Sequence, residues 1–235
     1  MNYKRSEVIM KKEDIIQKYR TEAKMGIDDL RAIISMLRAP DGCPWDKVQT
    51  HESIRNNFIE ETYEAVEAID NGDVPLLREE LGDVLLQVVF HACMEEEKGS
   101  FSLDDVANEV CRKLVLRHPH VFADVQADTV GAVLNNWDAI KQKSKHQSTA
   151  TETLESVARS LPALMRAEKM YGRAAKAGYA GAAMPSDDDS SVGADLLRIV
   201  CRAKDNGIDA EQKLYEACDA MTERVRAVEN GSAVK

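Results

Sequence analysis

The stretch ELGDVLLQVVFHA, residues 80–92, decides the fold because it is apolar around almost the whole circumference of a helix. It lies in a predicted helix from about residue 74 to residue 98, and a helix that is apolar nearly all round is normally buried. Its polar stripe consists of Glu80, Asp83, Gln87 and His91. Buried charge without a partner is costly, so this stripe is expected to face another polar group or a bound ion.

A second acidic cluster, EETYE at residues 60–64, lies one predicted helix earlier. Glu61 and Glu64 are three residues apart, as are Glu80 and Asp83, so each pair projects from one face of its helix. Side by side, the two helices would bring four or five carboxylates to one point, where like charges repel unless a cation neutralises them. Oxygen ligands without Cys or His favour Mg²⁺ or Mn²⁺ over zinc. The alternative to a metal site is that both acidic clusters lie on solvated helix faces and form surface ion pairs. The second helix is so apolar that it is expected to have little exposed surface for such a face.

The bulk composition indicates a helical protein, because aromatic residues make up only 5% of the chain and charged residues 31%. The net charge of −10 argues against a nucleic-acid partner. The five cysteines show no C-x-x-C spacing and are expected to be free thiols. The first 20 residues have no apolar signal core, and no run approaches a membrane span, so a cytoplasmic protein without a membrane partner is predicted.

Helical patterns follow one another along the chain without a convincing strand, which predicts an all-α fold. Thr50 is a candidate N-cap for the helix that carries the first acidic cluster, with Ser53 as the alternative. Two prolines and a glycine in residues 39–44 end the helix before it. The other helices are expected at about residues 4–20, 27–38, 74–98, 103–116, 130–146, 152–177 with a break at 161–162, 194–205 and 209–229.

The order of several motifs resembles a known family. E-E-x-x-E followed after 15 residues by E-x-x-D resembles the signature of the all-α nucleoside triphosphate pyrophosphohydrolases. Three further segments resemble the MazG family specifically, and the resemblance covers about residues 27–180. These segments are GCPWDKVQT at residues 42–50, RHPHVF at 117–122 and RSLPALM at 159–165.

The resemblance implies hydrolysis between the α- and β-phosphates of a nucleoside triphosphate, giving the monophosphate and pyrophosphate. It implies a four-helix-bundle-type module, Mg²⁺ as the cofactor with Mn²⁺ as a substitute, and an intertwined homodimer. Glu60 is the expected group that orients or deprotonates the attacking water. Carried over by position, the metal ligands are Glu61, Glu64, Glu80 and Asp83, and the catalytic carboxylates are Glu60, Glu61 and Glu64.

Several residues are candidates for substrate binding. Trp45, in a proline-bounded loop, is expected either to stack on a base or to cap the core. Lys141, Lys143 and Lys145 of the 130–146 helix are expected to form a solvated basic face, from which one lysine reaches the ligand. His91 and Gln87 are interpreted as buried hydrogen-bonded groups. The candidates for contact with the β- and γ-phosphates are Lys113, Arg117, Lys141 and Lys145.

The C-terminal part faintly repeats the middle of the chain. DVLLQVVF at residues 83–90, a glycine break and LDDV at 103–106 parallel DLLRIV at 195–200, a second glycine break and IDAE at 208–211. Val192 stands where Glu80 stood, so the second copy is expected to lack metal ligands. The expected organisation is an N-terminal helical extension (1–25), a MazG catalytic module (26–147), connecting helices (148–180), a flexible linker (181–193) and a truncated second module (194–235).

Two functions follow from these features. The first is Mg²⁺-dependent hydrolysis of NTPs or dNTPs, with house-cleaning of non-standard nucleotides as its expected purpose. The alternative is a catalytically weak module that senses nucleotide or binds a partner protein, which the missing second site suggests.

Overall fold

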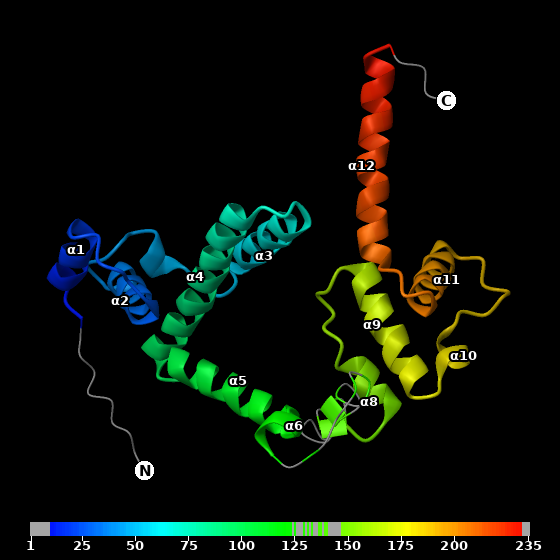
Figure 1. Ribbon diagram of the computed structural model, residues 1–235, viewed down its shortest axis with the longest axis horizontal. Coiled ribbons are helices and arrows are strands. Elements are labelled where there is room, and N and C mark those ends of the chain that lie inside the picture. The colour runs from blue at the N-terminus through cyan, green and yellow to red at the C-terminus, as the bar shows by residue number, and fades with distance from the viewer. Residues whose placement is uncertain are drawn as a thin grey trace. The chain divides into compact units, whose positions relative to one another are not determined.

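The computed structural model describes its regular elements as helices only, which confirms the predicted all-α class (Figure 1). The chain divides into two compact units, residues 1–115 and 116–235, which are described separately. None of the helices in the described part combines the length and the hydropathy of a membrane-spanning segment. The described residues are 10–123, 125, 129, 131, 133, 136, 137, 139, 140 and 147–231.

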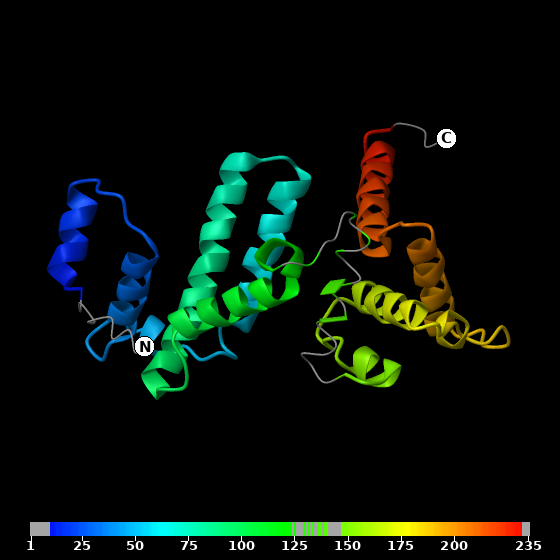
Figure 2. The ribbon, with the colours of Figure 1, turned by 60° about the horizontal axis from the view of Figure 1, so that its bottom comes forward.

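The first unit is built around a helical hairpin. Helices α3 and α4 lie side by side and run in opposite directions (Figure 2). Helix α2 packs on α4, and α1 packs on α2. The elements of this unit are α1 (Lys12–Arg20), α2 (Ile27–Arg38), the 3₁₀ helix η1 (Asp46–Val48), α3 (Arg55–Asp70), α4 (Val74–Lys98) and α5 (Leu103–Arg117), whose last two residues lie beyond the division.

The turn between α3 and α4 is short and locally specified. Gly72 has a φ of +65°, a conformation that glycine adopts without a steric penalty. Asp73 is the N-cap of α4, and its Oδ1 accepts a hydrogen bond from the Leu76 amide at 3.0 Å. Helix α4 ends at Gly99, which has a φ of +71°. The predicted bounds of this helix are confirmed.

The core of the first unit lies between α2, the start of α3 and the second half of α4. Arg38 crosses from α2 to Glu97 on α4 at 2.6 Å, and its guanidinium lies 5.1 Å from the centre of the Phe90 ring. The buried core residues are Ile34, Ile54, Val89, Phe90, Cys93 and Met94.

The first half of α4 is less buried than its apolar sequence predicts. Leu81 and Leu85 are 54% and 43% exposed within this chain, so the prediction of burial nearly all round is wrong for this half. The buried core begins at Val89, and the N-terminal half of α4 is left with α3 on one side.

The N-cap of helix α3 is Ile54, four residues after the candidate Thr50 and one residue after the alternative Ser53. The Thr50 amide donates to Ser53 Oγ at 2.9 Å, and the Ser53 amide donates to Thr50 Oγ1 at 3.2 Å. The two candidate caps therefore satisfy each other in a separate turn, and α3 starts at Arg55 after Ile54.

A chain of polar side chains fastens this turn to α4. His51 Nδ1 lies 2.7 Å from His91 Nδ1, and His51 Nε2 lies 2.6 Å from Glu95 Oε1. Lys98 Nζ donates to the same Glu95 oxygen at 2.7 Å. The hydrogen bonds from Lys98 and then His51 lower the pKa of Glu95 to about 2. Burial, and then the charge of His51, lowers the pKa of His91.

The loop between α2 and α3 folds back closely on the end of α2. The Cys43 amide donates to the Leu37 carbonyl at 2.8 Å. A Cβ atom at Gly42 would lie 2.3 Å from the Leu37 carbonyl oxygen and 2.4 Å from the Met36 carbonyl oxygen. Only glycine fits this approach, which sets the path of the loop that carries Trp45.

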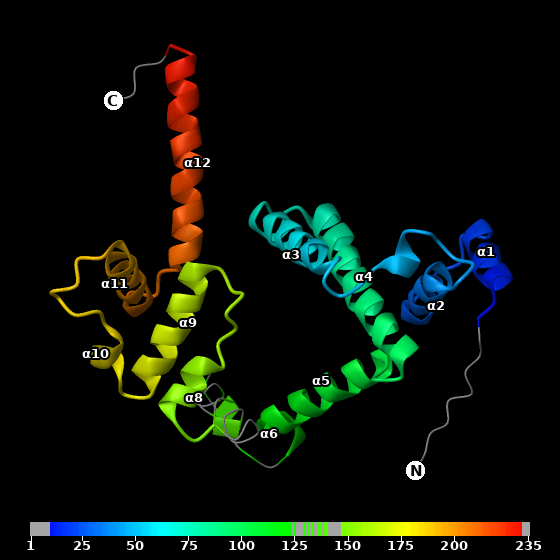
Figure 3. The same cartoon turned by 180° about the vertical axis from the view of Figure 1, so that it is seen from behind.

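The second unit is organised around α9, against which α8, α10, α11 and α12 pack (Figure 3). The buried Tyr171 hydroxyl donates to Asp205 Oδ2 at 2.7 Å and so joins α9 to α11. The predicted break at residues 161–162 is confirmed, because Pro162 is the N-cap of α9. The elements are α6 (Pro119–Phe122), α8 (Ala150–Glu155), α9 (Ala163–Lys176), α10 (Ala180–Ala183), α11 (Val192–Asp205) and α12 (Ala210–Glu229).

The segment 181–193, predicted as a flexible linker, makes defined contacts in the second unit. Arg198 on α11 donates to the Asp189 carbonyl at 2.7 Å, and Ser191 Oγ accepts from the Ala194 amide at 3.2 Å as the N-cap of α11. The division between the two compact units falls between Val115 and Leu116.

Replacing Gly42 by alanine tests the close loop approach. We expect Gly42→Ala to lower the free energy of unfolding by about 2 kcal/mol, because the new methyl group collides with two backbone carbonyls that cannot move independently. Gly82→Ala is the matched control, since a Cβ there meets nothing within 4 Å and alanine favours the α4 helix. Thermal unfolding followed by circular dichroism measures both, and equal stabilities would contradict the crowded loop.

The polar chain at Glu95 predicts a specific pH dependence. Because the folded-state pKa of Glu95 is depressed to about 2, its contribution to stability is complete above the ordinary value of 4.5 and is lost as the pH falls toward 2. The wild-type advantage over Glu95→Gln should therefore shrink across this range. Unfolding curves of both proteins at a series of pH values measure the difference, and a constant difference would contradict the assignment.

Candidate metal centre on the α3–α4 hairpin

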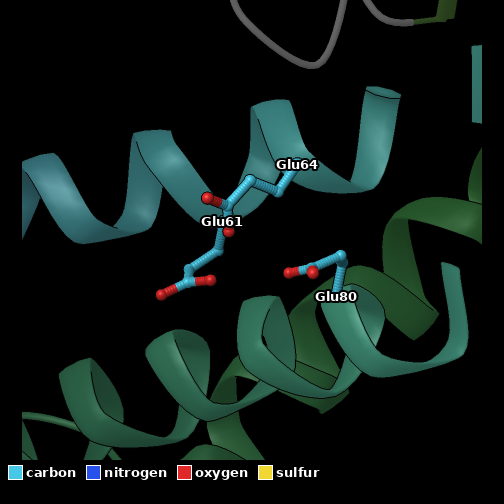
Figure 4. A group of neighbouring side chains, drawn as sticks. All are labelled: Glu61, Glu64 and Glu80. Carbon is cyan, nitrogen blue, oxygen red and sulfur yellow. The ribbon is translucent and has the colours of Figure 1, made fainter. Parts of the chain in front are cut away.

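Three carboxylates converge between α3 and α4. Glu61 and Glu64 extend from α3 toward Glu80, which comes from α4 (Figure 4). One carboxylate oxygen from each of the three lies within 4.8 Å of the others. The spacing of three residues places the two α3 side chains on one helix face, and the hairpin turns that face toward α4.

Burial and mutual repulsion strain this cluster electrostatically. Glu80 is buried, Glu61 is half-buried and Glu64 is exposed. Burial raises the pKa of Glu61, and the negative charges of Asp83, Glu64 and Glu80 raise it further. The pKa of Glu80 is also raised, first by burial and then by the charges of Glu64, Asp83 and Glu79.

The other two predicted carboxylates lie at the edge of the cluster. Asp83, half-buried one turn after Glu80, is close enough for its charge to raise the pKa of Glu61 and Glu80, but its oxygens fall outside the 4.8 Å group. Glu60 is exposed on α3 and also lies outside the group. The structure thus brings together three of the four predicted ligands and places the fourth beside them.

The donor set fits a hard divalent cation. Its atoms are all carboxylate oxygens, which Mg²⁺ and Mn²⁺ prefer. No ion pair among the described side chains includes Glu61, Glu64 or Glu80, so the charge that raises the pKa of Glu61 and Glu80 is not neutralised there by a lysine or arginine.

The predicted substrate-binding residues are spread over the chain. Trp45 is 57% exposed, which excludes core packing within its unit and leaves its indole face accessible. Lys113 is exposed on α5. Arg117 belongs to the second unit, where its guanidinium lies 5.4 Å from the centre of the Trp137 ring. Arg117 Nε is buried without a hydrogen-bond partner among the described residues. Lys141 and Lys145 lie outside the described residues.

The sequence did not single out the contact between His51 and His91. The prediction of a hydrogen-bonded His91 is confirmed, and Gln87 is buried as expected. His91 was predictable because it lies on the polar stripe of α4. His51 lies in a turn, where no helical spacing indicates which residues it contacts. The pocket beside the two histidines measures about 700 Å³ and is lined by His51, Glu52, Arg55, Phe58, Val88, His91, Ala92, Phe101 and Val106.

Comparison with known proteins identifies relatives of this chain. The family described as "MazG nucleotide pyrophosphohydrolase domain" matches residues 49–122, which include the whole acidic cluster. The chain is 34% identical over 227 residues to the Thermotoga maritima "Nucleoside triphosphate pyrophosphohydrolase/pyrophosphatase MazG", covering 88% of this chain and 87% of the relative. It is 47% identical over 154 residues to the Escherichia coli (strain K12) "Nucleoside triphosphate pyrophosphohydrolase", covering 65% of this chain and 59% of the relative.

A further relative is the Bacillus subtilis (strain 168) protein "Uncharacterized protein YabN", which is 51% identical over 140 residues. That match covers 60% of this chain and 28% of the relative, so the chain spans only part of YabN and of the Escherichia coli protein. The match to the Thermotoga maritima protein covers most of both chains. This chain belongs to the MazG nucleotide pyrophosphohydrolase family.

Proposed function

We propose that this chain hydrolyses nucleoside triphosphates, NTPs or dNTPs, to the monophosphate and pyrophosphate. The observation that carries the proposal is the convergence of Glu61, Glu64 and Glu80 on one hairpin in a member of the MazG family. Two relatives named as nucleoside triphosphate pyrophosphohydrolases support the same activity. House-cleaning of non-standard nucleotides is the proposed purpose.

Glu61, Glu64, Glu80 and Asp83 would hold Mg²⁺, with Mn²⁺ as a substitute. A bound divalent ion would neutralise charge on the phosphates and lower the pKa of a coordinated water. The chain's own contribution is to hold the carboxylates at a fixed separation on two packed helices, so that little reorganisation is needed when the substrate binds.

Glu60 is the proposed group that orients or deprotonates the attacking water. It lies next to Glu61 on α3 but outside the converging group, so its oxygens are not committed to the metal. A carboxylate in this position can accept a proton from a water held nearby. Glu60, Glu61 and Glu64 together form the proposed catalytic set.

The phosphate contacts are assigned to basic residues, because hydrolysis of a phosphoanhydride needs charge neutralisation on the phosphates. Lys113, Arg117, Lys141 and Lys145 are proposed to contact the β- and γ-phosphates, and exposed Trp45 is proposed to stack on a base. The buried Nε of Arg117, which lacks a described partner, supports a role for this guanidinium in binding an anion.

The remaining organisation is proposed from the resemblance and the repeat. Residues 26–147 would form the catalytic module, and residues 194–235 would be a truncated second module without metal ligands. Helix α11 is followed by Gly207 with a φ of +69° and α12 is capped by Asp209, much as α4 is followed by Gly99 and then α5. A cytoplasmic homodimer without nucleic-acid or membrane partners is proposed.

The activity is tested with a panel of NTPs and dNTPs in the presence of Mg²⁺. We expect the monophosphate and pyrophosphate as products, separated by anion exchange. Glu64→Gln and Asp83→Asn should each lower turnover by about a hundredfold or more, because each removes negative charge from the metal site.

Glu67→Gln is the matched control for these variants. It removes one exposed carboxylate from the same helix α3 without touching the converging group, and its turnover should equal that of the wild type. Release of orthophosphate would contradict the cleavage position. Tight nucleotide binding without turnover would favour the alternative function of sensing nucleotide or binding a partner.

Metal binding should also stabilise the fold. Without metal, the converging like charges oppose packing of α3 on α4, as the raised pKa values of Glu61 and Glu80 indicate. Mg²⁺ at about 100 times its Kd should stabilise the protein by about 2.7 kcal/mol, which raises Tm by several degrees.

Two variants test the origin of this stabilisation by thermal unfolding with Mg²⁺ or with EDTA. Glu80→Gln should raise the Tm of the metal-free protein and abolish the response to Mg²⁺, because it removes a buried charge that is also a ligand. Glu67→Gln should keep the full response. A Tm that is indifferent to Mg²⁺ in the wild type would contradict a convergent metal site.

A further inference from the structure

The pocket at the two histidines is suited to a flat aromatic ligand. Its volume of about 700 Å³ falls in the range of small-molecule sites. The walls are largely apolar, with the Phe58 ring from α3, the Phe101 ring from the connection to α5, and the His91 imidazole from α4. The Phe58 and His91 rings lie 5.6 Å apart, and aromatic walls of this kind stack favourably on planar heterocycles.

The pocket lies farther along the same α3–α4 hairpin than the carboxylate cluster, with Phe58 on α3 and His91 on α4 in its lining. Phe58 precedes Glu61 by one helical turn on α3. Glu80, Gln87 and His91 are seven and four residues apart and so share one stripe of α4. From Asp83 to His91 the helix rises by about 12 Å. This offset suits a triphosphate at the carboxylates whose nucleoside extends toward the histidines.

The hydrogen-bond chain determines which nitrogen of His91 is free. The Glu95 carboxylate only accepts, so His51 Nε2 must carry a proton and donate to it. In a neutral imidazole His51 Nδ1 is then an acceptor, and the partner nitrogen 2.7 Å away, His91 Nδ1, must donate. His91 Nε2 is therefore left with a lone pair, and no hydrogen bond joins it to any described residue.

We propose that this pocket binds the nucleobase of the substrate and selects bases that offer an exocyclic amino group to Nε2 of His91. The inference rests on the proposed hydrolysis of nucleoside triphosphates. An amino group donates to the lone pair, whereas a carbonyl oxygen in the same place would face it with a second lone pair. A carbonyl-bearing base loses this hydrogen bond and meets repulsion instead, so its kcat/KM should be about tenfold lower than that of the matching amino-bearing base.

Protonation should reverse this preference. The site between the two Nδ1 atoms and the site between His51 Nε2 and Glu95 already hold a proton each, so an added proton goes to His91 Nε2 and makes it a donor. The charged groups around the pair are Glu95 and Lys98 from α4 and Glu52 and Arg55 from the other wall, while the α5 side contributes only Phe101 and Val106. At low pH a carbonyl-bearing base becomes the better partner.

The test compares pairs of bases in which a carbonyl group replaces an amino group and the adjacent ring nitrogen gains a hydrogen. With Mg²⁺ at about pH 8, kcat/KM should be about tenfold higher for cytidine than for uridine triphosphate, and for adenosine than for inosine triphosphate. His91→Phe keeps a planar ring in the stack but removes the lone pair, so both ratios should approach one. Because burial and then the charge of His51 lower the pKa of His91, the wild-type ratios should hold near pH 6.5 and fall toward one only as the pH is lowered further.

Two more variants separate recognition from general damage. Phe101→Ala removes one wall of the pocket at a side chain that is 43% exposed, so it should fold normally and raise KM for all four substrates about equally. Tyr179→Ala removes a similarly large side chain, 56% exposed in the second unit, and should change neither KM nor the ratios. Thermal unfolding of each variant measures any loss of folded protein directly.

The outcomes distinguish this inference from the proposed function. Turnover to pyrophosphate with wild-type ratios near one, or with ratios unchanged in His91→Phe, would overturn base selection here and leave the hydrolase intact. Failure to hydrolyse any triphosphate would overturn the proposed function. Calorimetric titration with the same four nucleotides then tests the pocket alone: a tenfold Kd preference lost in His91→Phe supports it, and equal Kd values overturn it.

Discussion

Antiparallel packing of α3 against α4 is the interaction on which the rest of the first unit depends. The turn at Gly72 and the cap at Asp73 fix where α4 begins, and the register follows from that start. Near this turn the register brings Glu64 to Glu80, and at the far end it brings the segment before α3 to His91. A shift of α4 by one residue would rotate its side chains by about 100° and separate both groups. A single geometric relation therefore positions the carboxylate cluster and the histidine pair together.

The pKa of a glutamate is shifted in opposite directions at the two ends of the hairpin. Glu80 is buried and has negatively charged neighbours, and both effects raise its pKa. Glu95 instead accepts hydrogen bonds from Lys98 and His51, which lower its pKa to about 2. Both belong to α4, and their neighbours alone determine the sign of the shift. Glu95 is satisfied by its partners and contributes to folding. Glu80 lacks such partners among the described residues, which is the condition that favours an external cation.

Much of this arrangement follows from local signals. The bounds of α4 were predictable because Asp73, Pro75 and Gly99 act within one turn of each end, and the convergence of Glu61, Glu64 and Glu80 followed from helical spacing. What escaped prediction depends on contacts distant in sequence. Neither candidate cap, Thr50 nor Ser53, caps α3, because the two bond to each other and the helix begins after Ile54. The partner of His51 lies 40 residues away, and the exposure of Leu81 depends on which helices pack beside it.

The shortness of the α3–α4 connection has a consequence for how the protein reaches this structure. Contacts between neighbouring helices close small loops and form early in folding, so the hairpin can assemble before the rest of its unit. Its caps, turn glycine and apolar contacts all favour that assembly, but the converging carboxylates oppose it. The cluster is therefore a point of local frustration within an otherwise consistent segment. A cation that binds there removes the conflict, so it would act as a folding partner as well as a cofactor.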